Sequence, residues 1–208
     1  KTPKPLIKIG TNCLLEKTII FLLKNKVNEI VINTHHLGDQ IKKFLKKKKF
    51  DTSIKISDEK NKLLDTGGGA LKASKFFKNK PFIIINPDTI WSSKYNKELK
   101  LLTKLYIKNR KPCLLLVNKN LSFDKSFVGD FNLRNSKVRK DKKNNYIFTG
   151  LQIIDHNAFH NIRKKIFSMN KVWHKLIKEK KLLGIKSKKT FYHVNNLKTY
   201  EKLLKKKI

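Results

Sequence analysis

The stretch PFIIIN, residues 81–86, is a continuous apolar run that ends on an amide side chain. Four apolar residues in succession are typical of a strand that is covered on both faces of a sheet. The stretch PCLLLVN, residues 112–118, repeats the pattern, and an amphipathic segment at 95–109 separates the two. Strands that alternate with helices of this length predict an α/β sheet with helices on both faces.

The same alternation extends in both directions from this pair. Helical spacing of apolar residues occurs at 12–26, 37–48, 69–79, 95–109, 157–166, 170–181 and 197–207, and strand character at 27–34, 52–59, 81–86, 112–118, 146–155 and 190–194. Residues 121–146 are polar and glycine-poor, which indicates a strand pair or a long excursion. We expect a Rossmann-like mixed, mostly parallel sheet flanked by helices, in one domain over residues 1–208. Residues 119–208 are expected to form an insertion and to complete the same sheet.

The charge of the chain is extreme, at +35, because 50 lysines and arginines outnumber 15 acidic residues. Only four of the basic residues are arginines, whereas base readout and bidentate phosphate contacts favour arginine. The lysines are scattered over every segment. We therefore expect solvated helix faces and a general attraction to phosphorylated ligands, not specific nucleic-acid binding; a polyanion-binding protein is the alternative.

Cys13 and Cys113 are the only cysteines, and two isolated cysteines make neither a disulfide framework nor a metal cluster. No apolar run approaches the roughly 20 residues that span a bilayer, and the first ten residues lack the hydrophobic stretch of a signal peptide. These features favour a cytoplasmic protein without membrane insertion.

In open α/β sheets ligands bind beyond the carboxyl ends of the strands. Polar residues occur there at four places: Asn33 with His35 and His36, residues 65–69, residues 86–88, and residues 150–152. Asp88 follows a buried strand in an acid-poor chain, and such a carboxylate is well placed to hold Mg²⁺. The alternative is an Asx turn or a helix N-cap.

The stretch LLDTGGGALKA, residues 63–73, places three glycines before a segment with helical character. Glycine is costly to order unless the backbone needs positive φ or a close approach. A glycine-rich turn at a helix N-terminus presents amide N–H groups to a phosphate or a polar ring edge. The alternative is a flexible connection between a strand and a helix.

Taken together, several motifs resemble those of sugar-1-phosphate nucleotidyltransferases. The motifs, in family order and approximate spacing, are KTPKPLIKIG (1–10), VNEIVINTHHLGDQI (27–41), LLDTGGGALKA (63–73), IINPDTIW (84–91), VGDF (128–131) and FTGLQII (148–154). The greatest likeness is to N-acetylmuramate-1-phosphate uridylyltransferases and mannose-1-phosphate guanylyltransferase-like proteins, and residues 167–185 and 191–203 extend it over essentially the whole chain. The resemblance implies a glycosyltransferase-A-like fold.

The resemblance also implies an activity. In the family a sugar 1-phosphate attacks the α-phosphorus of a nucleoside triphosphate, pyrophosphate leaves, and the nucleotide sugar serves cell-wall or surface glycans; UTP is favoured over GTP here. Lys4 and Asp88 would be catalytic, with Asp88 coordinating Mg²⁺. The implied nucleotide-binding residues are Lys4, Asp65, Thr66, Gly67, Gly68 and Asn86, and the implied sugar-binding residues are Gly129, Asp130, Thr149 and Gly150.

Two departures from the family pattern stand out. A strand and a glycine-rich loop that wraps the triphosphate normally precede the TPKP motif, so we expect an N-terminally truncated chain. The stretch YHVNN, residues 192–196, places His193 where many members carry an aspartate that serves as a second metal contact. His193 is therefore a candidate metal ligand, although histidine suits softer ions than Mg²⁺. A catalytically inactive protein that binds nucleotide or sugar phosphate is an alternative, and the sequence leaves monomer or dimer open.

Overall fold

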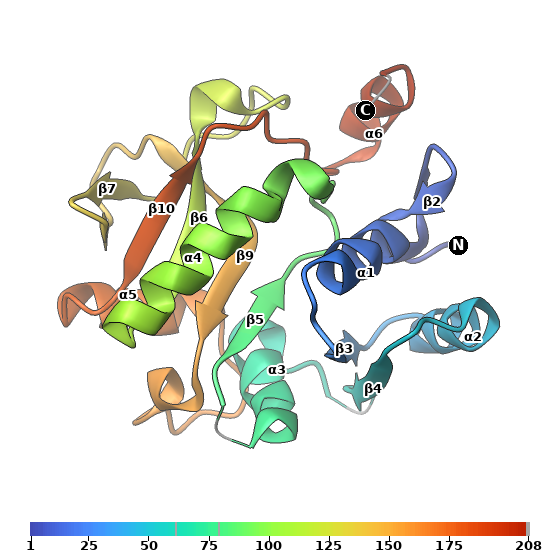
Figure 1. Ribbon diagram of the computed structural model, residues 1–208, viewed down its shortest axis with the longest axis horizontal. Helices are drawn as coiled ribbons and strands as arrows, with labels where there is room; N and C mark the ends of the chain where they lie inside the picture. The colour runs from blue at the N-terminus through green and yellow to red at the C-terminus, as the bar shows by residue number, and fades with distance from the viewer. Residues whose placement is uncertain (61, 79, 207–208) are drawn as a thin grey trace.

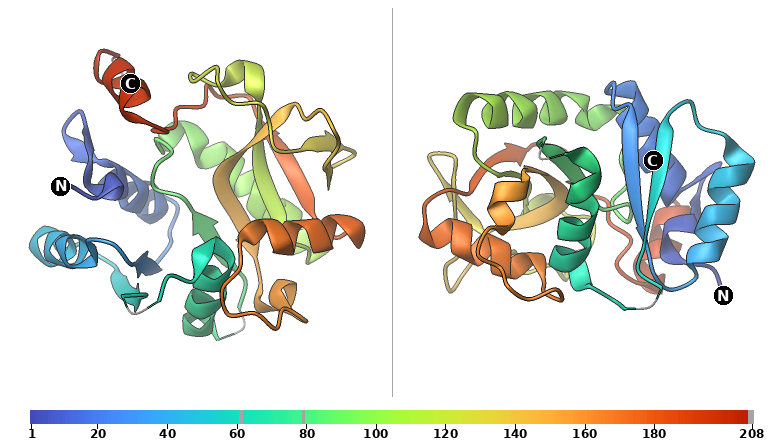
Figure 2. Two further views of the ribbon diagram at one scale, coloured as in Figure 1. Left: turned by 180° about the vertical axis from the view of Figure 1, so that it is seen from behind. Right: turned by 90° about the horizontal axis from the view of Figure 1, so that it is seen from below.

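A computed structural model describes residues 1–60, 62–78 and 80–206 and shows a mixed α/β fold (Figure 1). A six-stranded sheet has the strand order β5-β9-β6-β10-β8-β7. Its strands are β5 (Phe82–Ile85), β6 (Cys113–Asn118), β7 (Asn132–Arg134), β8 (Lys137–Arg139), β9 (Tyr146–Ile154) and β10 (Leu183–Ser187). Helix α4 (Asn96–Asn109) lies across one face, and α3 (Asp65–Ser74) and α5 (Met169–Lys178) lie on the other (Figure 2).

Two small sheets lie beside the large one. Strands β3 (Glu29–Thr34) and β4 (Ser53–Asp58) form a parallel pair next to helices α1 (Leu14–Lys24) and α2 (Gly38–Lys48). Strands β1 (Lys8–Ile9) and β2 (Asn12–Cys13) form an antiparallel pair near the N-terminus. Helix α6 (Leu197–Leu204) ends the described chain, and the Tyr200 hydroxyl donates a hydrogen bond to the Lys8 carbonyl at 3.0 Å. The C-terminal segment therefore returns to the N-terminal one.

The mixed α/β architecture with helices on both faces is confirmed, but the expectation of a mostly parallel sheet is wrong. Among the described residues of the six-stranded sheet, β6 and β10 form the only parallel pair. All other strand pairs of this sheet are antiparallel. The reason is that the chain leaves β6 through the β7–β8 hairpin and not through a crossover helix. It then returns as β9, antiparallel between β5 and β6.

Three secondary-structure expectations are corrected. The helix expected at 157–166 is a 3-10 turn over His156–Phe159, because the basic residues that follow are exposed and have no apolar face to bury. The strand expected at 190–194 forms only isolated bridges, through Phe191 and His193. Strand β10 was not expected; it follows the helix expected at 170–181, which is present as α5. Residues 79 and 207, which two expected helices included, lie outside the described residues.

The hydrophobic core is built around the apolar residues of β6. Leu114, Leu115 and Leu116 are fully buried, between two apolar clusters on opposite faces of the sheet. Trp91 stacks on Phe21 with ring centroids 5.7 Å apart, and Trp173 donates a hydrogen bond to the Gln152 side chain at 2.9 Å. Both tryptophans are packing residues of the core. None of the helices described here has the length and apolar character needed to cross a membrane.

A groove of about 1420 Å³ runs between β3 and β5 and is lined by both strands along their lengths. In the described chain β3 pairs only with β4 and β5 only with β9, so each strand presents one unpaired edge to the groove. The isoleucines of β5 were expected to be buried on both faces. They are only half-buried, because the groove leaves this side of the strand uncovered.

Candidate active site

Three of the residues predicted to act on substrate or metal meet beyond the end of β5. The Lys4 ammonium lies 2.8 Å from Asp88 Oδ2, although the two residues are 84 positions apart. His193 Nε2 lies 3.6 Å from the same carboxylate oxygen. The 3-10 turn Lys4–Leu6 supplies the lysine, the turn after β5 supplies the aspartate, and the segment before α6 supplies the histidine. The fold thus brings together Lys4, Asp88 and His193.

His193 is held by aromatic rings and by a hydroxyl that the sequence did not single out. Its ring stacks on Phe191 with centroids 5.6 Å apart, and burial lowers its pKa despite the opposing effect of Asp88. The Thr89 hydroxyl donates to the Thr149 carbonyl at 2.8 Å, and its oxygen lies 3.2 Å from His193 Nδ1. Because the hydroxyl proton is already used, Nδ1 must be the donor. The other ring nitrogen, Nε2, faces the Asp88 carboxylate.

The glycine-rich stretch is not a loop, because α3 begins at Asp65 and includes all three glycines. The N–H groups of Gly67 and Gly68 donate to the Phe167 carbonyl at 2.9 and 3.0 Å. A Cβ at Gly67 would lie 2.7 Å from this oxygen, and one at Gly68 would collide with the Lys165 carbonyl. The close approach that glycine permits here is therefore that of the chain's own segment 165–167. Contact of Gly67 and Gly68 with a nucleotide stays a prediction.

Asp65 and Thr66 are the exposed members of this turn, and both line the groove. Asp65 adopts a φ of 60°, which is rare for a residue with a side chain. The Thr66 hydroxyl accepts a hydrogen bond from the Met169 N–H at 2.9 Å. The exposed side chains at the start of α3 are thus available to a ligand, whereas the glycine N–H groups are already used.

Asn86 is positioned by a glycine on the neighbouring strand. Its N–H donates to the Gly150 carbonyl at 2.8 Å, and its side chain is exposed beside the groove. Gly150 has a φ of 89°, and a Cβ added there would lie 2.8 Å from Asn86 Cβ. Glycine is required at 150 both by its conformation and by this close approach. The absence of a side chain at Gly150 therefore leaves the space that Asn86 occupies.

The other three residues predicted to bind the sugar are Gly129, Asp130 and Thr149. Thr149 is 1% exposed and its hydroxyl donates to the Leu115 carbonyl at 2.9 Å, so its side chain faces the sheet and not a pocket. Asp130 is exposed, and its carboxylate accepts a hydrogen bond from the Phe148 N–H at 2.8 Å. Gly129, with a φ of 90°, precedes it in the same segment. Phe127, two residues earlier, contacts the His193 ring with centroids 5.7 Å apart.

Comparison with known proteins gives relatives of one kind. The chain is 23% identical over 202 residues to an N-acetylmuramate alpha-1-phosphate uridylyltransferase of Caulobacter vibrioides, a match that covers 93% of this chain and 84% of that protein. It is 31% identical over 123 residues to a D-glycero-alpha-D-manno-heptose 1-phosphate guanylyltransferase of Campylobacter jejuni, covering 59% of this chain and 51% of that protein. Both relatives are sugar-1-phosphate nucleotidyltransferases. No protein-family model matches this chain.

A solved structure has the same fold as this chain. HddC from Yersinia pseudotuberculosis superposes with a TM-score of 0.77 at 18% identity, over 98% of this chain and 89% of that one. At this identity the likeness establishes the fold alone, which is glycosyltransferase-A-like. The fold expected from the sequence is confirmed in this respect.

The residues of this candidate site can be tested for a fit to Mg²⁺. Asp88 Oδ1 is buried and has no hydrogen-bond partner among the residues that the structure describes. The described residues contain no cluster of three or more His, Cys, Asp or Glu side chains arranged for a metal ion. Mg²⁺ commonly uses one or two carboxylates and completes its shell with water and substrate phosphates, so the free Oδ1 fits it. The imidazole of His193 suits Mg²⁺ less well.

Proposed function

We propose that this chain transfers a nucleoside monophosphate from a nucleoside triphosphate to a sugar 1-phosphate, with release of pyrophosphate. The observation that supports this most directly is the Lys4–Asp88 pair, in which one carboxylate oxygen binds an ammonium and the other is buried and free. A cation and a free carboxylate oxygen at one point suit a metal-bound triphosphate. The likeness to a uridylyltransferase and a guanylyltransferase supports the same reaction class.

The reaction is an in-line displacement. An oxygen of the sugar phosphate forms a bond to the α-phosphorus, the bond from this phosphorus to the bridging oxygen breaks, and pyrophosphate carries away the electron pair. The Lys4 ammonium would stabilise the negative charge that develops on the phosphoryl oxygens. Mg²⁺, when bound at Asp88, supplies charge neutralisation and fixes the geometry of the phosphates. His193, which stacks on Phe191 and lies 3.6 Å from Asp88, would line the same position.

We further propose UTP over GTP as the nucleotide. The uridylyltransferase of C. vibrioides matches 93% of the chain, whereas the guanylyltransferase of C. jejuni matches 59%. Asp65 and Thr66 at the start of α3, together with Asn86, are the residues proposed to contact the nucleotide. The product would be a nucleotide sugar for cell-wall or surface glycans.

In the described chain, the groove between β3 and β5 is bordered by one unpaired edge of each strand. The groove is lined on both sides by half-buried or buried isoleucines, including Ile30, Ile32, Ile83 and Ile85. An additional strand would pair the free backbone groups of both edges and join the two sheets. The resemblance implies a strand and a glycine-rich loop upstream of residue 1. We propose the groove as the place of that strand, with its loop directed to Lys4 and Asp88.

The test is an assay of pyrophosphate release with UTP or GTP against a panel of sugar 1-phosphates that includes N-acetylmuramate and heptose derivatives. The assay is run on this chain and on the chain preceded by the strand and loop of a relative. We expect release with at least one pair of substrates. Binding of UTP by calorimetry without release by either protein would favour the nucleotide-binding alternative. Tight and strongly salt-dependent binding to nucleic acid would instead favour the polyanion-binding alternative.

A further inference from the structure

Glu59, just after β4, is a buried carboxylate in the wall of the groove, with 7% of its surface exposed. Its Oε1 accepts a hydrogen bond from Asn33 Nδ2 at 2.8 Å, and its Oε2 accepts one from the Leu64 N–H at 3.1 Å. The ion pairs found in the described part of the chain do not include Glu59. A buried carboxylate without a cation is costly, so its position calls for a reason other than stability.

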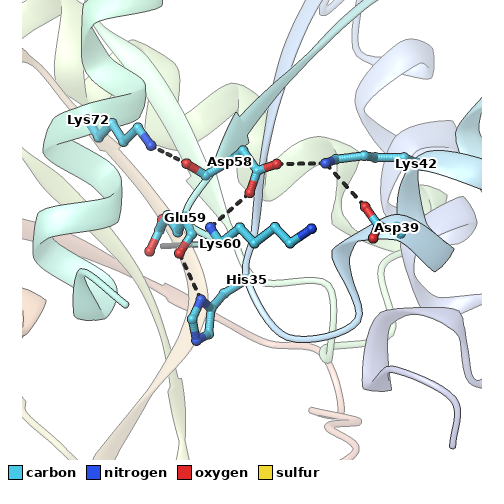
Figure 3. Close-up of polar contacts among 7 residues, drawn as sticks. All are labelled: His35, Asp39, Lys42, Asp58, Glu59, Lys60 and Lys72. Atoms are coloured by element: carbon cyan, nitrogen blue, oxygen red, sulfur yellow. Dashed lines mark hydrogen bonds and ion pairs between the residues drawn. The ribbon is translucent and has the colours of Figure 1, made fainter. Parts of the chain in front are cut away.

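Hydrogen bonds to the backbone groups of Glu59 hold this residue in place. The Glu59 N–H donates to the Thr34 carbonyl at 2.7 Å, and His35 Nδ1 lies 2.8 Å from the Glu59 carbonyl (Figure 3). Neighbouring Asp58 differs, because it is more exposed and its carboxylate pairs with Lys42 at 2.6 Å (Figure 3). Two adjacent acidic residues thus have separate environments, one at the surface and one against α3.

The position of Glu59 also explains why residue 69 in α3 is a glycine. Asn33 Nδ2 donates to the Gly69 carbonyl at 3.0 Å, in addition to its bond with Glu59. A Cβ at Gly69 would lie 2.7 Å from Glu59 Oε1 and 2.9 Å from Asn33 Nδ2. The helix therefore approaches this pair as closely as bare backbone permits. The negative charge of Glu59 lies at the N-terminal end of α3, where the helix dipole favours it.

We propose that Glu59 is a positioning residue for the nucleotide. It holds the Leu64 N–H and, through Asn33, the Gly69 carbonyl, and so fixes Asp65 and Thr66 between these two points. Glu59 does not touch the substrate. This inference rests on the proposed function, because it takes the start of α3 as a nucleotide contact.

The test compares Glu59→Gln with Asp58→Asn, two neighbouring substitutions that each remove one negative charge. In Glu59→Gln the amide group cannot accept from both Asn33 and Leu64, so the turn at 64–66 loosens. We expect KM for the nucleoside triphosphate to rise about tenfold, with kcat changed less than about threefold. Asp58→Asn loses only a partly exposed pair and should leave KM within about twofold.

Hydrogen exchange gives a readout that does not depend on turnover. In Glu59→Gln the amides of residues 64–69 should exchange about tenfold faster, while those of β6 keep their rates. If neither the parent chain nor the chain preceded by a relative's strand and loop shows turnover, the proposed function fails, and the exchange experiment still tests whether Glu59 holds the start of α3. An unchanged KM in an active enzyme, or equal acceleration of α3 and β6, would overturn the inference. Should Glu59→Gln not fold, Asn33→Ala carries the same predictions, because this exposed side chain joins the same two groups.

Discussion

Replacing Gly67 by alanine has opposite effects on stability through helix propensity and through packing. In a helix interior alanine is preferred over glycine by about 1 kcal/mol, so propensity alone predicts a more stable protein. The structure predicts the opposite, because the added Cβ would lie 2.7 Å from the Phe167 carbonyl oxygen and closer still to two carbons of the Phe167 ring. Phe167 is 5% exposed and cannot swing into solvent without uncovering core.

The size of the effect follows from the contacts that must move. Relieving the clash separates segment 165–167 from α3, which lengthens the hydrogen bonds from Gly67 and Gly68 to the Phe167 carbonyl, now 2.9 and 3.0 Å. Two such bonds contribute about 2 kcal/mol, and displacing the Phe167 ring adds about 1 kcal/mol. After subtraction of the propensity gain, Gly67→Ala should destabilise the protein by about 2 kcal/mol. For a chain of this length that lowers Tm by about 4–8 °C.

Thermal and urea unfolding followed by circular dichroism measure this loss. Lys46→Ala on the exposed face of α2 is the control and should change stability by less than about 0.5 kcal/mol. An unchanged or raised Tm for Gly67→Ala would refute the reasoning. It would mean that segment 165–167 does not pack against the start of α3.

Two further substitutions test the support of the site. Gly150→Ala must take a φ of 89° and place Cβ 2.8 Å from Asn86 Cβ, so we expect a loss of about 2–4 kcal/mol in unfolding experiments; a loss below 0.5 kcal/mol would contradict the assigned approach. Thr89→Val keeps the shape of the side chain but leaves the Thr149 carbonyl and His193 Nδ1 without a partner, which should cost about 1–3 kcal/mol. The control for Thr89→Val is Thr89→Ser, which keeps the hydroxyl and should retain most of the stability; equal losses in the two variants would rule out the hydroxyl as the cause.

The apolar pattern predicted most strands and helices but not how the strands pair. The runs at 81–86 and 112–118 indicated buried strands, and both are strands of the large sheet. The antiparallel insertion of β9 between them could not be predicted, because a strand has the same apolar pattern in either direction. The half-exposure of β5 was missed for a related reason, since burial depends on which strand lies alongside.

The site was predictable where side chains carry the chemistry and hidden where the backbone does. Lys4 and Asp88 could be found because a cation and a carboxylate stand in recognisable motifs. The three glycines were noticed, but their partners are the carbonyl groups of Lys165 and Phe167 and the buried Glu59. A backbone acceptor that lies a hundred residues away cannot be recognised from the sequence around the glycines.

Asp88 is the residue on which the proposed activity depends most directly. The decisive measurement is pyrophosphate release by Asp88→Asn and by the parent chain, each with Mg²⁺, nucleoside triphosphate and the sugar 1-phosphate that the panel identifies. Asparagine keeps the shape but removes the charge that pairs with Lys4 and faces the position proposed for Mg²⁺. The account predicts a drop in kcat of roughly a hundredfold or more, with Tm changed by less than about 4 °C. A variant that folds and keeps kcat within about threefold of the parent would contradict the account, because the reaction would then not depend on the Lys4–Asp88 site.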